Sequence, residues 1–502
     1  MLELMKLNRY ILGMVLVIGL AGCKKDFLEK APLDTINTDN FYKTADDAIA
    51  AVNGAYQPLQ WPKLYNMRMW TSDIMAGNSE VGAGGGQDGI ETQHKANFIT
   101  TPENAGVLDL WRGPFPGILR SNIVLDKVPS IEMDPVLKNR VLGEAKFLRG
   151  HYYFILVRYF GDVPLILQPL YPGDDLRPAR TPKDQVYQQI IKDLEEAATL
   201  LPPREQYSGG DIGRASKGSA LGLLAKVHLT LGNWQKVIEL TDQVKALGYA
   251  LNEQYGDNFN PLTENSKESL FEVQYNKEGK YDFWSNENQA SWTSTFTGPR
   301  NANFVEGGWG WNQPTQEFVS AYEPGDLRKD VTILYEGGPK YDGKDYKKSF
   351  SLTGYNLRKF LVPRSMAPTY DKSPLNFPVL RYSDVLLMRA EALNELGKAG
   401  DAQLPASDPN ATLNKVRARA GLANISGLGQ AALREKILHE RRMELAFEGQ
   451  RWFDLVRVNN GQWGLNFLHS IGKTNATAKH LLLPIPQQER DVNPNLTQNP
   501  GY

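Results

Sequence analysis

The chain has 502 residues, enough for one large domain or several of ordinary size. Hydrophobic residues make up 41% and charged residues 23%, so a sizeable core can form and wholesale disorder is disfavoured. The formal net charge of -1 leaves no basic excess for a nucleic-acid backbone, and we expect no nucleic-acid partner.

The N-terminus predicts a signal sequence. Lys6 and Arg9 precede an apolar run over residues 10–20, which is too short to span a bilayer as a helix. Leu20-Ala21-Gly22-Cys23 then places a cysteine where a bacterial lipobox has its acylated residue. We expect residues 1–22 to be removed and Cys23 to carry acyl chains. Each methylene group of these chains that is buried in the membrane contributes about 0.8 kcal/mol to anchoring. The alternative is an ordinary signal peptide with a chance cysteine.

Cysteine and histidine chemistry is limited. Cys23 is the only cysteine, so the chain can form neither an intrachain disulfide nor a cysteine metal cluster. The six histidines make no HExxH pair. We therefore assign no metal ligand and expect no cofactor and no zinc hydrolase of the HExxH type.

Apolar residues at helical spacing predict most of the body. In residues 135–161, apolar side chains step by three and four to form one continuous stripe. A helix over residues 107–128 should be broken or kinked by Pro114 and Pro116. The remaining expected helices cover residues 39–59, 182–201 and 215–248, the last as a helix-turn-helix.

Two helix pairs share a pattern. Ala225 precedes Gly232 by seven positions, and Ala390 precedes Gly397 by seven, each glycine following a leucine. Small residues at such positions allow close helix packing, as in tetratricopeptide units. A generic antiparallel helix pair is the alternative.

Between the helical regions lies a long irregular segment. Short strands are expected over residues 270–274 and 331–335, and a short helix over 316–322. Helical periodicity otherwise fails from residue 275 to about 378. An irregular region of this length in a compact protein usually carries function.

Aromatic residues gather in two irregular segments. Residues 281–311 hold eight aromatics, where the chain average of 10% gives about three. We expect ligand contacts there from Trp284, Trp292, Trp309 and Trp311, with loss of binding but not of folding when each is changed to alanine.

An earlier loop is expected to meet this segment and complete the ligand surface, because flat rings stack on sugars or peptide side chains. The alternative is a loop-covered subcore. The earlier loop contributes Trp61, Tyr65, Arg68, Trp70 and Asp73.

Known catalytic signatures are weak or absent. Gly84, Gly86 and Gly89 form a GxGxxG that neither follows a strand nor opens a helix, so we interpret it as a loop. No GxSxG occurs. The sequence places no two carboxylates across a cleft, so a glycosidase pair is neither shown nor excluded.

Charges recur at helical spacing over residues 434–457. Glu440, Glu444 and Glu448 lie four apart, Arg441 lies three before Glu444, and Arg451 lies three after Glu448. Such neighbours can pair on one helix. Because large apolar residues are interleaved, we expect a partly buried structural helix; a solvated helix is the alternative.

This run, with the closing stretch LLLPIPQQERDVNPNLTQNPGY and the lipoprotein start, resembles the SusD/RagB family of lipid-anchored nutrient-binding proteins. The resemblance implies a mostly α fold: a tetratricopeptide-like scaffold with a large irregular loop region and a few short strands. We expect a single SusD-like domain over residues 23–502, with the scaffold roughly at 34–250 and 374–460 and ligand-facing loops roughly at 60–103 and 275–378.

The resemblance also implies a function. Family members are non-catalytic and pass a nutrient to a SusC-like TonB-dependent barrel at the outer membrane, held by the lipid anchor and facing the exterior. The ligand expected here is an oligosaccharide or a peptide, the former favoured by the aromatic loops. A secreted glycan hydrolase and a periplasmic helical-repeat adaptor for a protein partner are the alternatives.

Overall fold

The computed structural model describes residues 42–82, 88–171, 173–277 and 282–502. The expected signal sequence and Cys23 lie outside these residues. A mostly helical architecture is confirmed. The longer helices are α2 (Ala45–Tyr56), α5 (Ala105–Arg112), α6 (Phe115–Lys127), α7 (Pro135–Phe160), α8 (Lys183–Leu200), α9 (Lys217–Thr230), α10 (Trp234–Ala246), α14 (Tyr382–Glu395), α17 (Gln430–Glu444) and α19 (Gln462–Ser470).

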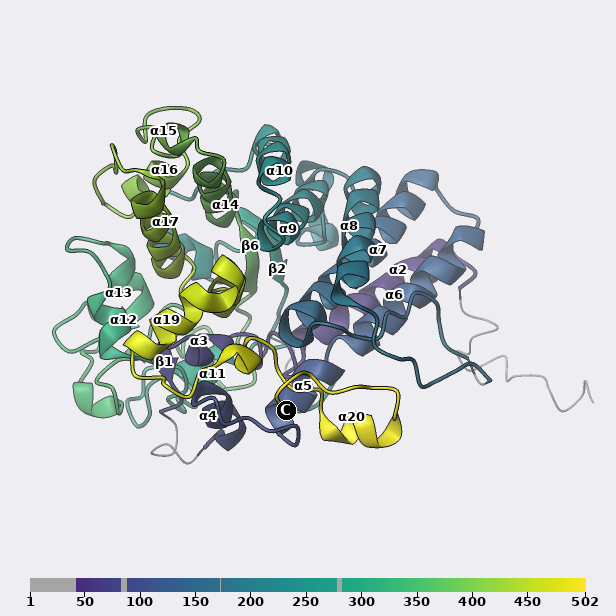
Figure 1. The fold of residues 1–502 in the computed structure, drawn as a ribbon, viewed down its shortest axis with the longest axis horizontal. Coiled ribbons are helices and arrows are strands. Elements are labelled where there is room, and N and C mark those ends of the chain that lie inside the picture. Colours follow the sequence, from purple (N-terminus) through teal and green to yellow (C-terminus); the bar gives the residue numbers. More distant parts are fainter. Residues whose placement is uncertain (1–41, 83–87, 172, 278–281) are drawn as a thin grey trace, which may run out of the picture.

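These helices form a row. Packing contacts connect α2 to α6, α6 to α7, α7 to α8, α8 to α9, α9 to α10, α10 to α14 and α14 to α17. In Figure 1 the row runs along one edge of the molecule, from α6 and α7 to α14 and α17. Consecutive antiparallel pairs of this kind make the tetratricopeptide-like scaffold that the sequence predicts.

Local chemistry explains the helix boundaries. In α7, Pro135 occupies the first turn and the Asp134 carboxylate accepts a 2.8 Å hydrogen bond from the Leu137 amide. Gly161 follows at φ 71, where glycine ends a helix without strain. Pro114 separates α5 from α6, as expected from the two prolines.

Short helices carry the irregular region on the other side of the row (Figure 1). Their bounds are α3 (Ser72–Met75), α4 (Ile90–Ala96), α11 (Thr293–Thr297), α12 (Gln316–Ser320), α13 (Arg328–Thr332), α18 (Arg451–Arg457) and α20 (Gln487–Val492). Two further short helices, α15 (Ala399–Ala402) and α16 (Leu413–Arg419), lie at the end of the row beside α14 and α17.

Antiparallel strand pairs tie distant segments together. In the described residues these are β2 (Ser269–Val273) with β6 (Phe377–Arg381), β4 (Ile333–Leu334) with β5 (Asn356–Leu357), and β1 (Ser79–Glu80) with β3 (Gln313–Pro314). The strand expected at 270–274 is confirmed as β2. The one expected at 331–335 is shortened to β4, because α13 occupies residues up to Thr332.

The expected single helix over residues 434–457 is wrong. The chain forms α17 and then α18, separated by a turn in which Phe447 has φ 63 and Gly449 has φ 72. Glycine is required at 449, since a Cβ there would lie 2.9 Å from the carbonyl oxygen of Met69. The turn therefore packs directly on the segment before α3.

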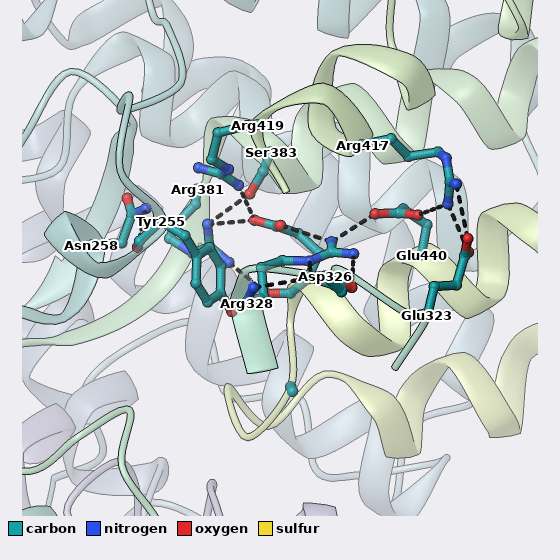
Figure 2. Close-up of polar contacts among 12 residues, drawn as sticks. Tyr255, Asn258, Glu323, Asp326, Arg328, Arg381, Ser383, Arg417, Arg419 and Glu440 are labelled. Carbon is teal, nitrogen blue, oxygen red and sulfur yellow. Dashed lines mark hydrogen bonds and ion pairs between the residues drawn. The ribbon is translucent and has the colours of Figure 1, made fainter. Parts of the chain in front are cut away.

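The five charges of the expected ladder, Glu440, Arg441, Glu444, Glu448 and Arg451, are buried, as expected. They do not pair with one another. Glu444, at the end of α17, accepts from Arg381 at 2.9 Å, Arg419 at 2.5 Å and Arg328 at 3.2 Å. These side chains, together with Glu268 and Glu440, are called the buried ion-pair network below (Figure 2). It connects α17 to α13, α16 and the end of β6.

Arg441, Glu448 and Arg451 also find partners elsewhere. Arg441 donates to Asp384 at 2.8 Å and Asp454 at 3.0 Å, and Glu448 accepts from Arg381 and Lys359 at 2.7 Å each. Within the described part of the chain, Arg451 has no carboxylate partner. Its guanidinium instead lies 4.8 Å from the ring centroids of Trp463 and Phe467. The expected self-pairing ladder is therefore wrong: apart from Asp454, which lies on α18, these partners come from distant segments.

Candidate functional site

The two aromatic segments meet, as expected. The side-chain oxygen of Asn66 accepts a 2.7 Å hydrogen bond from the Trp292 amide, and its nitrogen donates to the Ala290 carbonyl at 3.0 Å. The rings of Trp70 and Phe296 pack with centroids 6.1 Å apart. The earlier segment thus lies beneath the later one.

Residues 64–79 are buried throughout, although they were expected within a ligand-facing loop. The Tyr65 hydroxyl lies 2.9 Å from His151 Nε2, and Trp70 is fully buried. Asp73 accepts from the amides of Phe447 at 3.3 Å and Gly449 at 3.0 Å. Tyr65, Trp70 and Asp73 therefore support the site from below and are not open to a ligand in this conformation.

Burial governs the electrostatics of Asp73. It raises the pKa of this carboxyl to about 6, while hydrogen bonds from Asn78, Gly449 and Phe447 act in the opposite direction. Among the described residues, no group of three or more histidine, aspartate or glutamate side chains is arranged to hold a metal ion. The carboxylate has a structural role.

The later segment forms an aromatic cluster, defined as Phe283, Trp284, Trp292, Phe296, Trp309 and Trp311. Phe283 and Phe296 lie at its centre, with centroids 4.9 Å apart. Trp284 packs on Phe283 at 5.0 Å, and Trp309 packs edge-on against Phe296 at 4.7 Å. Edge-to-face pairs of this kind hold their rings in fixed orientations.

The four tryptophans differ in exposure. Trp292 and Trp311 are buried in the cluster, with 2% and 6% of their surface exposed. Trp284 is 52% exposed, and Trp309 is intermediate. Only Trp284 and Trp309 can therefore present a ring to a ligand in this conformation, and Trp292 and Trp311 form part of the subcore.

Arg68 connects the segments electrostatically. Its guanidinium lies 5.8 Å from the centroid of the Trp284 ring and donates to Glu91 at 2.8 Å and Asp109 at 2.7 Å. The arginine is itself buried. It holds Trp284 by a cation–π contact from within the protein.

Polar groups lie beside Trp309. Arg300 donates from Nε to the Trp309 carbonyl at 2.7 Å and pairs with Asp88 at 2.7 Å. Gly89, next to Asp88, has φ 62, and a Cβ at that position would collide with the Trp311 ring. The platform, meaning Trp284 and Trp309 with Asp88 and Arg300, thus combines flat apolar faces with hydrogen-bonding groups, as suits a sugar.

Trp61 lies elsewhere. Its indole nitrogen donates to the Asn286 carbonyl at 3.1 Å, and its ring lines a separate groove of about 800 Å³ beside α5 and α6. The sequence could not distinguish this position from that of Trp70, because both belong to one aromatic loop. Asp88 and Arg300 were missed, since single charges in loops carry no periodic signal.

Family models match both halves of the chain. Residues 267–502 match the family described as "SusD family", and residues 26–229 match the one described as "Starch-binding associating with outer membrane". SusD-like protein P2 of Formosa agariphila is 30% identical, covering 97% of this chain and 98% of its own. The chain belongs to the SusD family.

Solved SusD structures share the fold. A laminarin binding SusD-like protein has a TM-score of 0.78 and 31% identity, covering 92% of this chain and 100% of its own. A SusD superfamily protein from Parabacteroides distasonis gives 0.73 and 28%, covering 93% and 100%. Surface glycan-binding protein A from Bacteroides uniformis gives 0.77 and 25%, covering 91% and 99%. The first and the third of these neighbours are named for what they bind, laminarin and glycans. This SusD family member is a binding protein rather than an enzyme.

Proposed function

We propose that this SusD family protein binds an oligosaccharide on the platform and leaves it chemically intact. The observation that carries the proposal is the half-exposed Trp284 ring, which Arg68 contacts from below. Phe283 and Phe296 connect it to Trp309. Stacking on sugar faces needs rigid rings, and hydroxyl groups need the donors and acceptors that Arg300 and Asp88 supply.

Laminarin is the first candidate ligand. The laminarin binding relative is similar over most of its length and supports this choice. Isothermal titration calorimetry of the purified protein with laminarin, other oligosaccharides and peptides tests this ligand. Chromatography of the recovered ligand then shows whether it is still intact. Saturable binding of an intact glycan is expected. Binding of peptides alone would change the ligand class, and cleaved glycan would contradict the proposal.

We further propose that the protein is anchored through Cys23 to the outer membrane and passes its ligand to a SusC-like TonB-dependent barrel. The lipobox supports the anchor, and the description of the matched family supports the membrane. No described helix has both the length and the apolar character needed to cross a bilayer. Protease treatment of intact cells should degrade the protein if it faces the exterior; survival of the protein with an intact membrane would contradict that location.

A further inference from the structure

The groove lined by Trp61 is unusually apolar for an open surface. It has a volume of about 800 Å³ and lies between α5, α6, the segment around Leu170 and α20. Leu176 and Val492 on its rim are each 64% exposed, and Leu119 is 42% exposed. Single exposed leucines are ordinary, but several around one groove indicate a surface that another segment covers.

The rim of this groove carries positive charge. Lys63 and Arg177 line it, and neither has an ion-pair partner within the described ranges. The third basic residue, Arg112, is neutralised by Glu489 at 2.7 Å. An occupant that combines apolar side chains with acidic ones would satisfy both the floor and the rim.

We propose that residues 26–41 of the same chain occupy this groove. This segment reads DFLEKAPLDTINTDNF and supplies Phe27, Leu28, Leu33 and Ile36 as apolar anchors. It holds four acidic residues and one lysine. The match to the family model begins at residue 26, so the segment belongs to the part of the chain that the family shares.

The segment can reach the groove. Tyr42, the first described residue, packs against the core. Burial raises the pKa of its hydroxyl, and so does the nearby Tyr171. The Lys127 ammonium lies 5.7 Å from the centroid of the Tyr171 ring. Tyr171 follows Leu170 on the groove wall. Lys127 lies eight positions after Leu119 on α6, about 12 Å along the helix axis. Sixteen extended residues span up to about 55 Å. Docking would seat the tether against the scaffold and fix the platform relative to the anchor.

Site-specific photo-cross-linking tests this placement. The protein is produced from Lys24 onward, with a benzophenone amino acid in place of Val492. After irradiation it is digested, and the cross-linked peptides are sequenced by mass spectrometry. We expect an intramolecular cross-link to a peptide within residues 26–41. The matched control replaces Leu262, an exposed leucine outside the groove, and should give no such link. Cross-links from position 492 to a second copy, or to no part of residues 26–41, would overturn the proposal.

Hydrogen exchange provides an independent readout. Amides of residues 27–36 should exchange at least tenfold more slowly in the unsubstituted chain than in Leu176→Asp, which places a charge on the groove rim. Leu176 is exposed, so this variant should fold. Equal exchange in both proteins would overturn the proposal.

Discussion

Arg381, the last residue of β6, donates to the carboxylate of Glu444, the last residue of α17, over 2.9 Å, and both side chains are buried. Arg419 and Arg328 donate to the same carboxylate. The buried ion-pair network therefore joins the helical row to the irregular region that bears the platform. Each charged side chain of the network depends on the others as its partners, because a buried charge without a partner is costly.

Changing Glu444 should destabilise the whole protein. Glu444→Gln leaves three buried arginines short of a carboxylate, and breaking a buried pair in this way costs about 3–5 kcal/mol. A denaturant titration monitored by circular dichroism measures the free energy of unfolding. A loss below about 1 kcal/mol would show that the network contributes no more than a surface pair does.

Arg441 allows a comparison with a matched control. Arg441→Gln removes contacts to Asp384 and Asp454, all of them buried, and we expect a loss of about 3–5 kcal/mol. Arg434→Gln on the same helix removes a partly exposed pair with Glu395 and should cost no more than about 1 kcal/mol. Equal effects of the two changes on the unfolding free energy would count against the account.

His151 gives a pH dependence with a defined sign. Burial, aided by Arg158 and Lys226, lowers its pKa to about 3, whereas the unfolded chain titrates near 6.5. Below pH 6.5 the unfolded state gains a proton that the folded state refuses, so stability falls as pH falls toward 3. Between pH 6.5 and 4.5 this contribution should be about 2 kcal/mol. His151→Gln should remove that part of the slope; an unchanged slope would contradict the assignment.

The tryptophans of the aromatic cluster should separate into two groups. Trp292→Ala opens a cavity in the subcore and should cost about 3–5 kcal/mol of stability, which a denaturant titration would detect. Trp284→Ala removes a half-exposed ring and should change stability by less than about 1 kcal/mol. If both variants unfold at the same denaturant concentration as the original protein, the distinction between subcore and platform is wrong.

The sequence predicted the elements whose cause is local. The apolar stripe and the proline and glycine boundaries of α7 follow from neighbouring residues, and α5 and α6 part at Pro114 for the same reason. The partners of Glu444 could not be predicted, because Arg328 and Arg381 lie 116 and 63 positions away. Self-pairing at helical spacing was the only arrangement that local sequence could suggest.

The platform shows the same limit. Trp284 and Trp292 lie eight positions apart in one aromatic segment, yet their exposed fractions are 52% and 2%. Composition indicated where rings gather but not which of them face outward. That difference depends on the earlier segment beneath, where Asn66 binds the backbone at Trp292 and Arg68 supports Trp284.

Isothermal titration calorimetry tests glycan binding at Trp284 most directly. Laminarin oligosaccharides are titrated into the original protein, Trp284→Ala and Trp234→Ala. Trp234 lies on α10, in the helical row, and serves as the control. A central stacking residue contributes about 2 kcal/mol or more, so Trp284→Ala should weaken binding at least about 30-fold. Trp234→Ala should bind as the original does. Equal affinity in all three proteins would contradict a glycan site at Trp284.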